Sequence, residues 1–480
     1  MPPILKKKIP LPLIIMPPVC FLGLILCPQE LLASSELHLD GASLSLAWAL
    51  PFAGMLLSIA LFPLFAAHFW EKNYGKVAIF WVLSLTIPQF IVFGPEVTLY
   101  NGLHTIVGEY IPFIIVLIAL FTISGGIRVK GTLTGTPLLN LIILTIGTIL
   151  ASIMGTTGAS MLLIRPFIRA LSHRKYKTHS IIFFIFLVSN AGGCLTPLGD
   201  PPLFLGFIKG VDFFWTAAHL WKQTSFLCVI LLILYFIIDL MYYRKEGSPK
   251  IEHSEKLSLE GKINFLLLFC VVGLVLFSGM SSIKSKIVIW GEVEYAVANL
   301  IRDLGLLSLA GLSLLLTKKE SRRANHFTWA PILEVTKLFL GIFITMLPAI
   351  TILRAGASGA LGSLVSLVTA PDGSPVNLAY FWLTGALSSF LDNAPTYLVF
   401  FNSAGGDAQH LMHDIPLTLA AISCGAVFLG ANTYIGNAPN FMVRSIAEER
   451  GIKMPSFFGY TLWSILILEP IFVVMSLIFF

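Results

Sequence analysis

The sequence predicts an all-α polytopic membrane protein, and its composition is the first of three observations behind that prediction. Of its 480 residues, 56% are hydrophobic and 12% are charged, and the mean hydropathy is +0.87. A soluble domain carries about 25% charged residues, so this chain has too little polar surface to face water on every side. Apolar runs recur along the sequence with the length of about 20 residues that a helix needs to cross a bilayer.

The second observation is a short motif that occurs twice. Residues 196–202 (TPLGDPP) and 433–439 (TYIGNAP) both read Thr-x-x-Gly-[Asp/Asn]-x-Pro, and they are 237 residues apart (433 − 196). The same offset aligns residues 151–159 (ASIMGTTGA) with residues 388–396 (SSFLDNAPT) without a gap. One offset shared by two separate helix-breaking patches indicates an internal duplication, with a single site built from both halves.

The third observation is the distribution of Lys and Arg over the loops. When the apolar runs are threaded through a membrane in order, the basic loops fall on one side only if 131–171 and 377–402 are re-entrant hairpins. The exceptions are Lys284, Lys286 and Arg354. In this threading the first hairpin opens to the cytoplasm and the second to the outside. The prediction is therefore two inverted-topology repeats, each with a re-entrant hairpin and a broken transmembrane helix.

The elements follow in order along the chain. Residues 1–45 hold an apolar run (9–28) that reads either as a cleaved signal or as a retained first helix with a cytoplasmic N-terminus, followed by an outer loop. The first repeat, 46–243, is expected to contain spans near 46–68, 76–95, 110–127, 179–198 and 223–243, besides its hairpin. A cytoplasmic linker covers 244–262. The second repeat, 263–480, is expected to contain spans near 263–281, 296–316, 330–353, 415–435 and 458–480, and residues 96–109 and 403–414 are predicted outer loops.

Two carboxylates are the first candidates for a functional role. Asp200 lies in the first copy of the motif and Asp392 lies in the break of the second hairpin. A charged carboxylate inside a membrane is costly unless it is paired, solvated or protonated, and no Lys or Arg lies in either patch. Such a group can exchange a proton for a cation. The alternative for either residue is that it only caps a half-helix N-terminus.

Neutral polar residues and glycines surround these carboxylates in the sequence. Gly199 and Gly436, with the prolines that follow them, are expected to interrupt their helices; freed carbonyls then suit a cation, and half-helix N-termini suit an anion. The alternative is that these residues only permit close packing and kinks. The candidate hydroxyl and amide ligands are Thr156, Thr157, Ser189, Asn190, Thr196, Asn393, Thr433 and Asn437.

Other function classes find little support in the sequence. The net charge of +6 lies in short loops, where topology explains it better than nucleic-acid binding. There is no P-loop, no H-E-x-x-H and no nucleophile motif, so we expect no enzyme. The six cysteines stand singly in apolar runs without a C-x-x-C pair, which argues against a resident metal or a disulfide framework.

These patterns resemble the ion transporter superfamily, which includes NhaD-type sodium/proton antiporters, citrate and dicarboxylate carriers, and arsenite permeases. Residues 189–200 (SNAGGCLTPLGD) and 391–395 (LDNAP) are similar to the NhaD-type pattern, and the resemblance covers the chain from about residue 45 onward. Dicarboxylate carriers of this superfamily have Ser-Asn-Thr triplets at these positions. Here the corresponding residues are GTT (155–157), SNA (189–191), DNA (392–394) and ANT (431–433), which weakens the carboxylate interpretation.

The leading hypothesis is therefore a secondary active transporter that exchanges Na⁺ or Li⁺ for H⁺, with Asp200 and Asp392 alternating between protonated and cation-bound states. The alternative is a sodium-coupled citrate or dicarboxylate carrier, which an intramembrane Asp without a buried Arg disfavours by repulsion. We expect no cofactor beyond the transported ions, membrane lipids as surroundings, and a multi-pass location in a bacterial cytoplasmic (inner) membrane. Homodimers are common in the superfamily, so a homodimer is a further expectation.

Overall fold

The computed structural model describes residues 39–131, 134–246 and 258–480. The apolar run at 9–28 and the middle of the predicted linker lie outside the described residues. Within the described part, nine helical segments are long and apolar enough to cross a membrane. The chain is thus an α-helical polytopic membrane protein, to which two short antiparallel ribbons are added.

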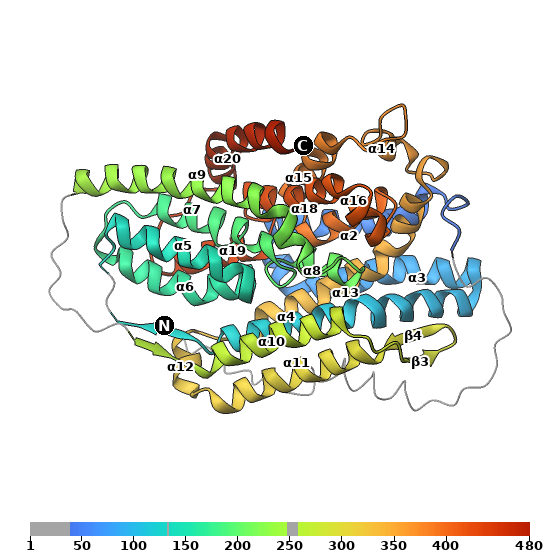
Figure 1. The fold of residues 1–480 in the computed structure, drawn as a ribbon, viewed down its shortest axis with the longest axis horizontal. Helices are drawn as coiled ribbons and strands as arrows, with labels where there is room; N and C mark the ends of the chain where they lie inside the picture. Colours follow the sequence, from blue (N-terminus) through green and yellow to red (C-terminus); the bar gives the residue numbers. More distant parts are fainter. Residues whose placement is uncertain (1–38, 132–133, 247–257) are drawn as a thin grey trace.

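Most of the described helices are labelled in Figure 1. In order, the elements of the first half are η1 Leu46–Ala49, α2 Leu50–Phe65, α3 Ala67–Thr105, the π-helical η2 Ile106–Tyr110, α4 Ile111–Ser124, β1 Arg128–Lys130, α5 Pro137–Met154, α6 Thr156–Ala170, η3 Leu171–His173, α7 Thr178–Leu187, η4 Ala191–Leu195, α8 Pro201–Ile208 and α9 Trp215–Glu246. Those of the second half are β2 Ser258–Glu260, α10 Ile263–Met280, β3 Lys286–Trp290, β4 Val293–Ala296, α11 Val297–Leu316, α12 Lys319–Ala324, α13 Ala330–Arg354, η5 Gly356–Ser358, α14 Gly362–Ser366, α15 Asn377–Phe390, α16 Asn393–Ser403, α17 Ala408–His413, α18 Pro416–Leu429, η6 Gly430–Asn432, α19 Ala438–Glu449 and α20 Phe457–Phe479.

The long helices divide by packing into two groups. Helices α2, α3, α4, α10, α11 and α13 pack mainly on one another, while α5 to α9 pack with α15, α16, α18, α19 and α20. Contacts between the groups run from α13 to α16 and from α4 to α6. Each group draws helices from both halves of the chain, so the two halves interleave in space.

One expected loop is helical in the structure. Residues 96–109 belong to α3 and η2, because the chain turns at Gly94 and resumes a helix at once. Gly94 has φ +85°, a left-handed conformation that favours glycine, and Pro95 after it has the fixed φ that suits a first helical residue. The loop was predicted because residues 96–109, between the predicted spans 76–95 and 110–127, include several polar side chains. The other predicted outer loop, 403–414, contains the short helix α17.

The two ribbons lie at opposite ends of α10 (Figure 1). β1 pairs with β2, where Arg128 bonds Glu260 across the ribbon at 3.2 Å, and β3 pairs with β4. In the second ribbon the Lys286 ammonium lies 2.7 Å from the Glu294 carboxylate. One of the basic exceptions to the predicted charge distribution is therefore paired with an acidic neighbour.

Candidate functional site

Two pairs of helices lie where the sequence predicted re-entrant hairpins, and each pair turns at the expected residue. In the first hairpin (α5–α6), Gly155 separates the two helices with φ +82°, a conformation that a side chain would disfavour. In the second hairpin (α15–α16), Leu391 is extended and Asp392 caps α16.

The helices are also interrupted at the two motif copies, as the sequence predicted. The first broken helix consists of α7, η4 and α8, and the second consists of α18, η6 and α19. Asp200 and Asn437 occupy the same place in the two copies, as the N-cap residues of α8 and α19. Prolines follow within the first turn of each new helix, where a missing N–H costs no helical hydrogen bond.

The hydrogen bonds between hairpin and broken helix are the same in the two halves, at positions offset by 237 residues. The Thr196 hydroxyl donates to the Ser152 carbonyl, and the Thr433 hydroxyl donates to the Ser389 carbonyl. The Ser152 hydroxyl in turn donates to the carbonyl of Gly192, and that of Ser389 donates to Leu429. These bonds fasten each hairpin to the broken helix of its own half. They give the sequence duplication a counterpart in the fold.

The motif glycines permit close backbone approach. A Cβ atom on Gly199 would overlap the Gly193 carbonyl, and one on Gly436 would overlap the carbonyls of Gly430 and Ser388. The Gly199 carbonyl, expected to be free for a cation, accepts the Thr156 backbone N–H at 2.8 Å. It retains one lone pair for any further partner.

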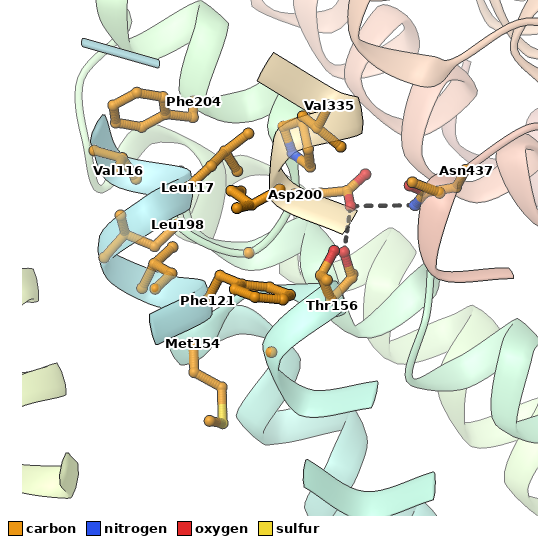
Figure 2. A pocket seen from close by; sticks show the side chains of 18 of the residues that line it. Val116, Leu117, Phe121, Met154, Thr156, Leu198, Asp200, Phe204, Val335 and Asn437 are labelled. Atoms are coloured by element: carbon orange, nitrogen blue, oxygen red, sulfur yellow. Dashed lines mark hydrogen bonds between the residues drawn. The ribbon is translucent and has the colours of Figure 1, made fainter. Parts of the chain in front are cut away.

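The Asp200 carboxylate lies where both halves of the chain meet. It accepts the Thr156 hydroxyl at 2.7 Å, the Asn437 amide at 3.3 Å and the amide of Asn393. These donors come from the first hairpin, the second broken helix and the second hairpin. Asp200 itself is 2% exposed and has no basic partner among the described residues. Figure 2 shows Thr156 and Asn437 converging on it.

Asp200 and Asp392 both line one cavity between the two helix groups. Helices α4 and α13 form one wall, and the hairpin turns with the starts of α8 and α19 form the other. The lining is mainly apolar, and no Lys, Arg or His is among the described residues that form it. The lining residues labelled in Figure 2 are Val116, Leu117, Phe121, Met154, Thr156, Leu198, Asp200, Phe204, Val335 and Asn437.

The second hairpin turn contributes two polar groups. The partly buried Asp392 accepts the Ala394 backbone N–H at 3.2 Å, so it does cap α16, as one interpretation of the sequence expected. The adjacent Asn393 is fully buried, and its side-chain oxygen has no hydrogen-bond partner. A buried acceptor without a donor is costly. A proton donor or a cation would satisfy it.

An amide network joins the two broken helices behind Asp200. The Asn437 amide donates to the Ser189 carbonyl at 3.0 Å and to the Asn190 side-chain oxygen at 3.3 Å. The Asn190 amide donates to Asn440 at 2.8 Å, and Asn440 donates onward to the carbonyls of Gly430 and Thr433. No sequence pattern indicated Asn440, which lies just beyond the second motif.

The remaining candidates are less directly placed. Thr157 lines the cavity. The Ser189 hydroxyl pairs with Ser160 at 2.9 Å and does not bond a carboxylate. Because the hydroxyls of Thr196 and Thr433 bond hairpin carbonyls, these two residues position the site instead of facing its cavity.

A comparison with protein-family models matches residues 41–480 to a family described as "Putative citrate transport". The chain belongs to this family. It is a transporter of the ion transporter kind, and with nine long apolar helices among its described residues it is a multi-pass membrane protein. No match was found among curated proteins. The match to the citrate-transport family includes both hairpins, both broken helices and the walls of the cavity.

Proposed function

We propose that this transporter exchanges Na⁺ or Li⁺ for protons, with Asp200 and Asp392 as the groups that bind either ion. When the carboxylates lose their protons, their oxygens are free for the cation; when protons return, the cation leaves. The Asn393 oxygen supplies a neutral ligand beside Asp200. Oxygen ligands suit a hard cation.

The observation that supports cation exchange is the charge of the cavity. Two carboxylates line it, and the described residues around it include no basic side chain. Inside a membrane such a site attracts a cation or a proton, because either one removes the cost of an unpaired charge. The polar donors on Asp200 are neutral hydroxyl and amide groups, which leave that negative charge uncompensated.

The alternative is a sodium-coupled carrier of citrate or a related carboxylate, and the description of the family favours it. The half-helix N-termini of α8 and α19 would face the anion, as such termini do in other carriers. A citrate anion in this cavity would lie beside two carboxylates. The repulsion between like charges makes this alternative the weaker one.

Flux measurements on purified protein in liposomes test the proposal. With a proton gradient and a pH-sensitive dye, NaCl and LiCl are expected to drive proton movement, while KCl and choline citrate are not. Labelled citrate uptake, with and without Na⁺, is measured on the same preparation, and empty liposomes are the control. Strong sodium-dependent citrate uptake without cation-driven proton movement would contradict the antiport proposal and support the citrate-carrier alternative.

We further propose that the two halves have opposite orientations in a bacterial cytoplasmic membrane. The first hairpin would then open to the cytoplasm and the second to the outside. The basic loop after α6 and the loops around α15 and α17, which contain no Lys or Arg, support this arrangement. Inverted repeats of this kind serve alternating access in many secondary transporters.

Cysteine labelling of intact cells is expected to reveal this orientation. Single cysteines at the exposed positions Asp372 and Gln409, next to the open end of the second hairpin, should react with an impermeant thiol reagent added outside. Cysteines at exposed Lys175 and Lys319 should react only after permeabilisation. The native cysteines are replaced by alanine for this test. If Lys175 and Asp372 react from the same side, the inverted arrangement is wrong.

A further inference from the structure

A carboxylate outside the cavity lies deep in the last helix. Glu469 is the only charged residue of α20 (Phe457–Phe479), 12 residues from its start and 10 from its end. At about 1.5 Å per residue it lies about 15 Å or more from either end, within a hydrocarbon core roughly 30 Å thick. An ionisable residue at such depth is costly and indicates a function.

The contact that Glu469 makes is with the second broken helix. The Asn432 side-chain nitrogen donates to a Glu469 carboxylate oxygen at 2.8 Å and to the Ser389 hydroxyl at 3.0 Å. Asn432 is the last residue of η6, where the helix is interrupted. No basic side chain pairs with Glu469 among the described residues. Among the described residues, the carboxylate of Glu469 is therefore stabilised only by a hydrogen bond from a neutral amide.

The side-chain amide of Asn432 has hydrogen-bond partners for its nitrogen but none for its oxygen. Asn432 is 7% exposed, and its side-chain oxygen has no hydrogen-bond partner. The present amide orientation, nitrogen toward the carboxylate, suits a charged Glu469. Once Glu469 carries a proton, its O–H can donate to the amide oxygen if the amide turns over, and the unpaired acceptor is then satisfied.

The helices around α20 offer Glu469 no other partner. Besides η6, α20 packs on α9 and α15. η6 has no titratable side chain, and in the described structure none of those on α15 or α9 forms a hydrogen bond or ion pair with Glu469. These are Tyr380 on α15 and His219, Lys222, Cys228, Tyr235, Asp239, Tyr242, Tyr243, Arg244, Lys245 and Glu246 on α9.

We propose that Glu469 is a second, separate proton-binding site, coupled to the cavity through Asn432. The proton comes from water and binds a carboxylate oxygen; no covalent bond of the protein breaks. Asn432 bonds both Glu469 and Ser389. Ser389 lies three residues before Asp392, and Asn432 lies five residues before Asn437, so a movement of Asn432 reaches two residues of the cavity. The residue 237 positions before Glu469 is Leu232, so the site belongs to one half only.

A proton fits this site better than a metal cation. A metal cation would need several oxygen ligands, whereas Asn432 is the one side chain that bonds Glu469 among the described residues. The described residues also hold no group of three or more His, Cys, Asp or Glu side chains arranged for a metal ion. The role of this proton in transport rests on the proposed antiport. The existence of the proton-binding site does not depend on that proposal.

Infrared difference spectroscopy of the protein in lipid nanodiscs tests the site directly. On acidification, the wild type is expected to gain a carbonyl band of a protonated carboxyl group that Glu469→Gln lacks. Asn432→Ala should shift this band, and Glu292→Gln, an exposed carboxylate between β3 and β4, should leave it unchanged. If Glu469→Gln does not fold, Glu469→Asp serves instead and should shift the band. If the band is unchanged by substitutions at position 469, the proposal is wrong. If the band disappears when Na⁺ is added at constant pH, the site binds a cation instead and the proposal is also wrong.

A flux measurement then connects the site to transport. With the membrane potential clamped, Glu469→Gln is expected to move one proton fewer per cation than the wild type. An unchanged ratio, with the band assigned to Glu469, contradicts the coupling through Asn432. If the wild type moves no protons with Na⁺ or Li⁺, the antiport proposal fails, and the infrared result still decides whether Glu469 binds a proton.

Discussion

Asp200→Asn is expected to abolish cation-driven proton movement at the Na⁺ concentrations that saturate the wild type, while the protein still folds and inserts. The variant keeps the shape of the side chain but removes the negative charge that Thr156, Asn393 and Asn437 surround. Two unit charges 4 Å apart attract by about 4 kcal/mol at an effective dielectric constant near 20. Losing that attraction weakens cation binding about a thousandfold. The half-saturating Na⁺ concentration in the dye assay measures it.

A swap variant is the matched control for this loss. Asp200 and Asn437 are equivalent residues of the two motif copies, and their side chains are in contact at 3.3 Å. In the double variant Asp200→Asn, Asn437→Asp, one carboxylate and one amide again share that contact. Part of the lost Na⁺ affinity should return. Near-normal flux in the single variant, or no gain in a well-folded swap variant, would count against Asp200 as the charged ligand.

The positions of the helix breaks could be predicted from the sequence because they depend on local chemistry. Gly155 allows a backbone conformation that other residues avoid, and the motif prolines suit only the first turn of a new helix. The repeat offset was equally visible, since Thr196 and Thr433 bond equivalent carbonyls. Most of the spans also begin and end near the expected residues.

The contacts across the site could not be predicted, because they depend on how the two halves pack. Nothing in the sequence indicates that Asn393 bonds Asp200, 193 residues away, or that α4 and α13 close the cavity. Asn440 lies outside both motifs, and Glu469 stands alone in an apolar run. Single polar residues of this kind acquire a meaning only when their neighbours in space are known.

Asp392→Asn is expected to be as damaging to transport as Asp200→Asn, although Asp392 also caps a helix. Asn and Asp are nearly equal as N-cap residues, because either side chain accepts the backbone N–H. The variant therefore keeps the bond to Ala394 and the start of α16. It removes the second negative charge of the cavity. Proton flux driven by Na⁺ should fall below detection, with unchanged protein levels in the membrane.

A second capping residue separates the two roles of Asp392. Asp407 caps α17 in the same way, accepting the Gln409 backbone N–H at 2.9 Å, but it is exposed and does not line the cavity. If Asp392 were only a cap, Asp392→Asn and Asp407→Asn would both transport like the wild type. If it binds the ion, only Asp392→Asn loses flux, and in the wild type acidification weakens Na⁺ binding because protons occupy the same oxygens. Under the carrier alternative, Asp392→Asn would preserve or raise citrate uptake, since one repulsive charge is gone. Proton flux and labelled citrate uptake, measured on both variants across a pH series, therefore distinguish a cap, an ion-binding carboxylate and a citrate carrier.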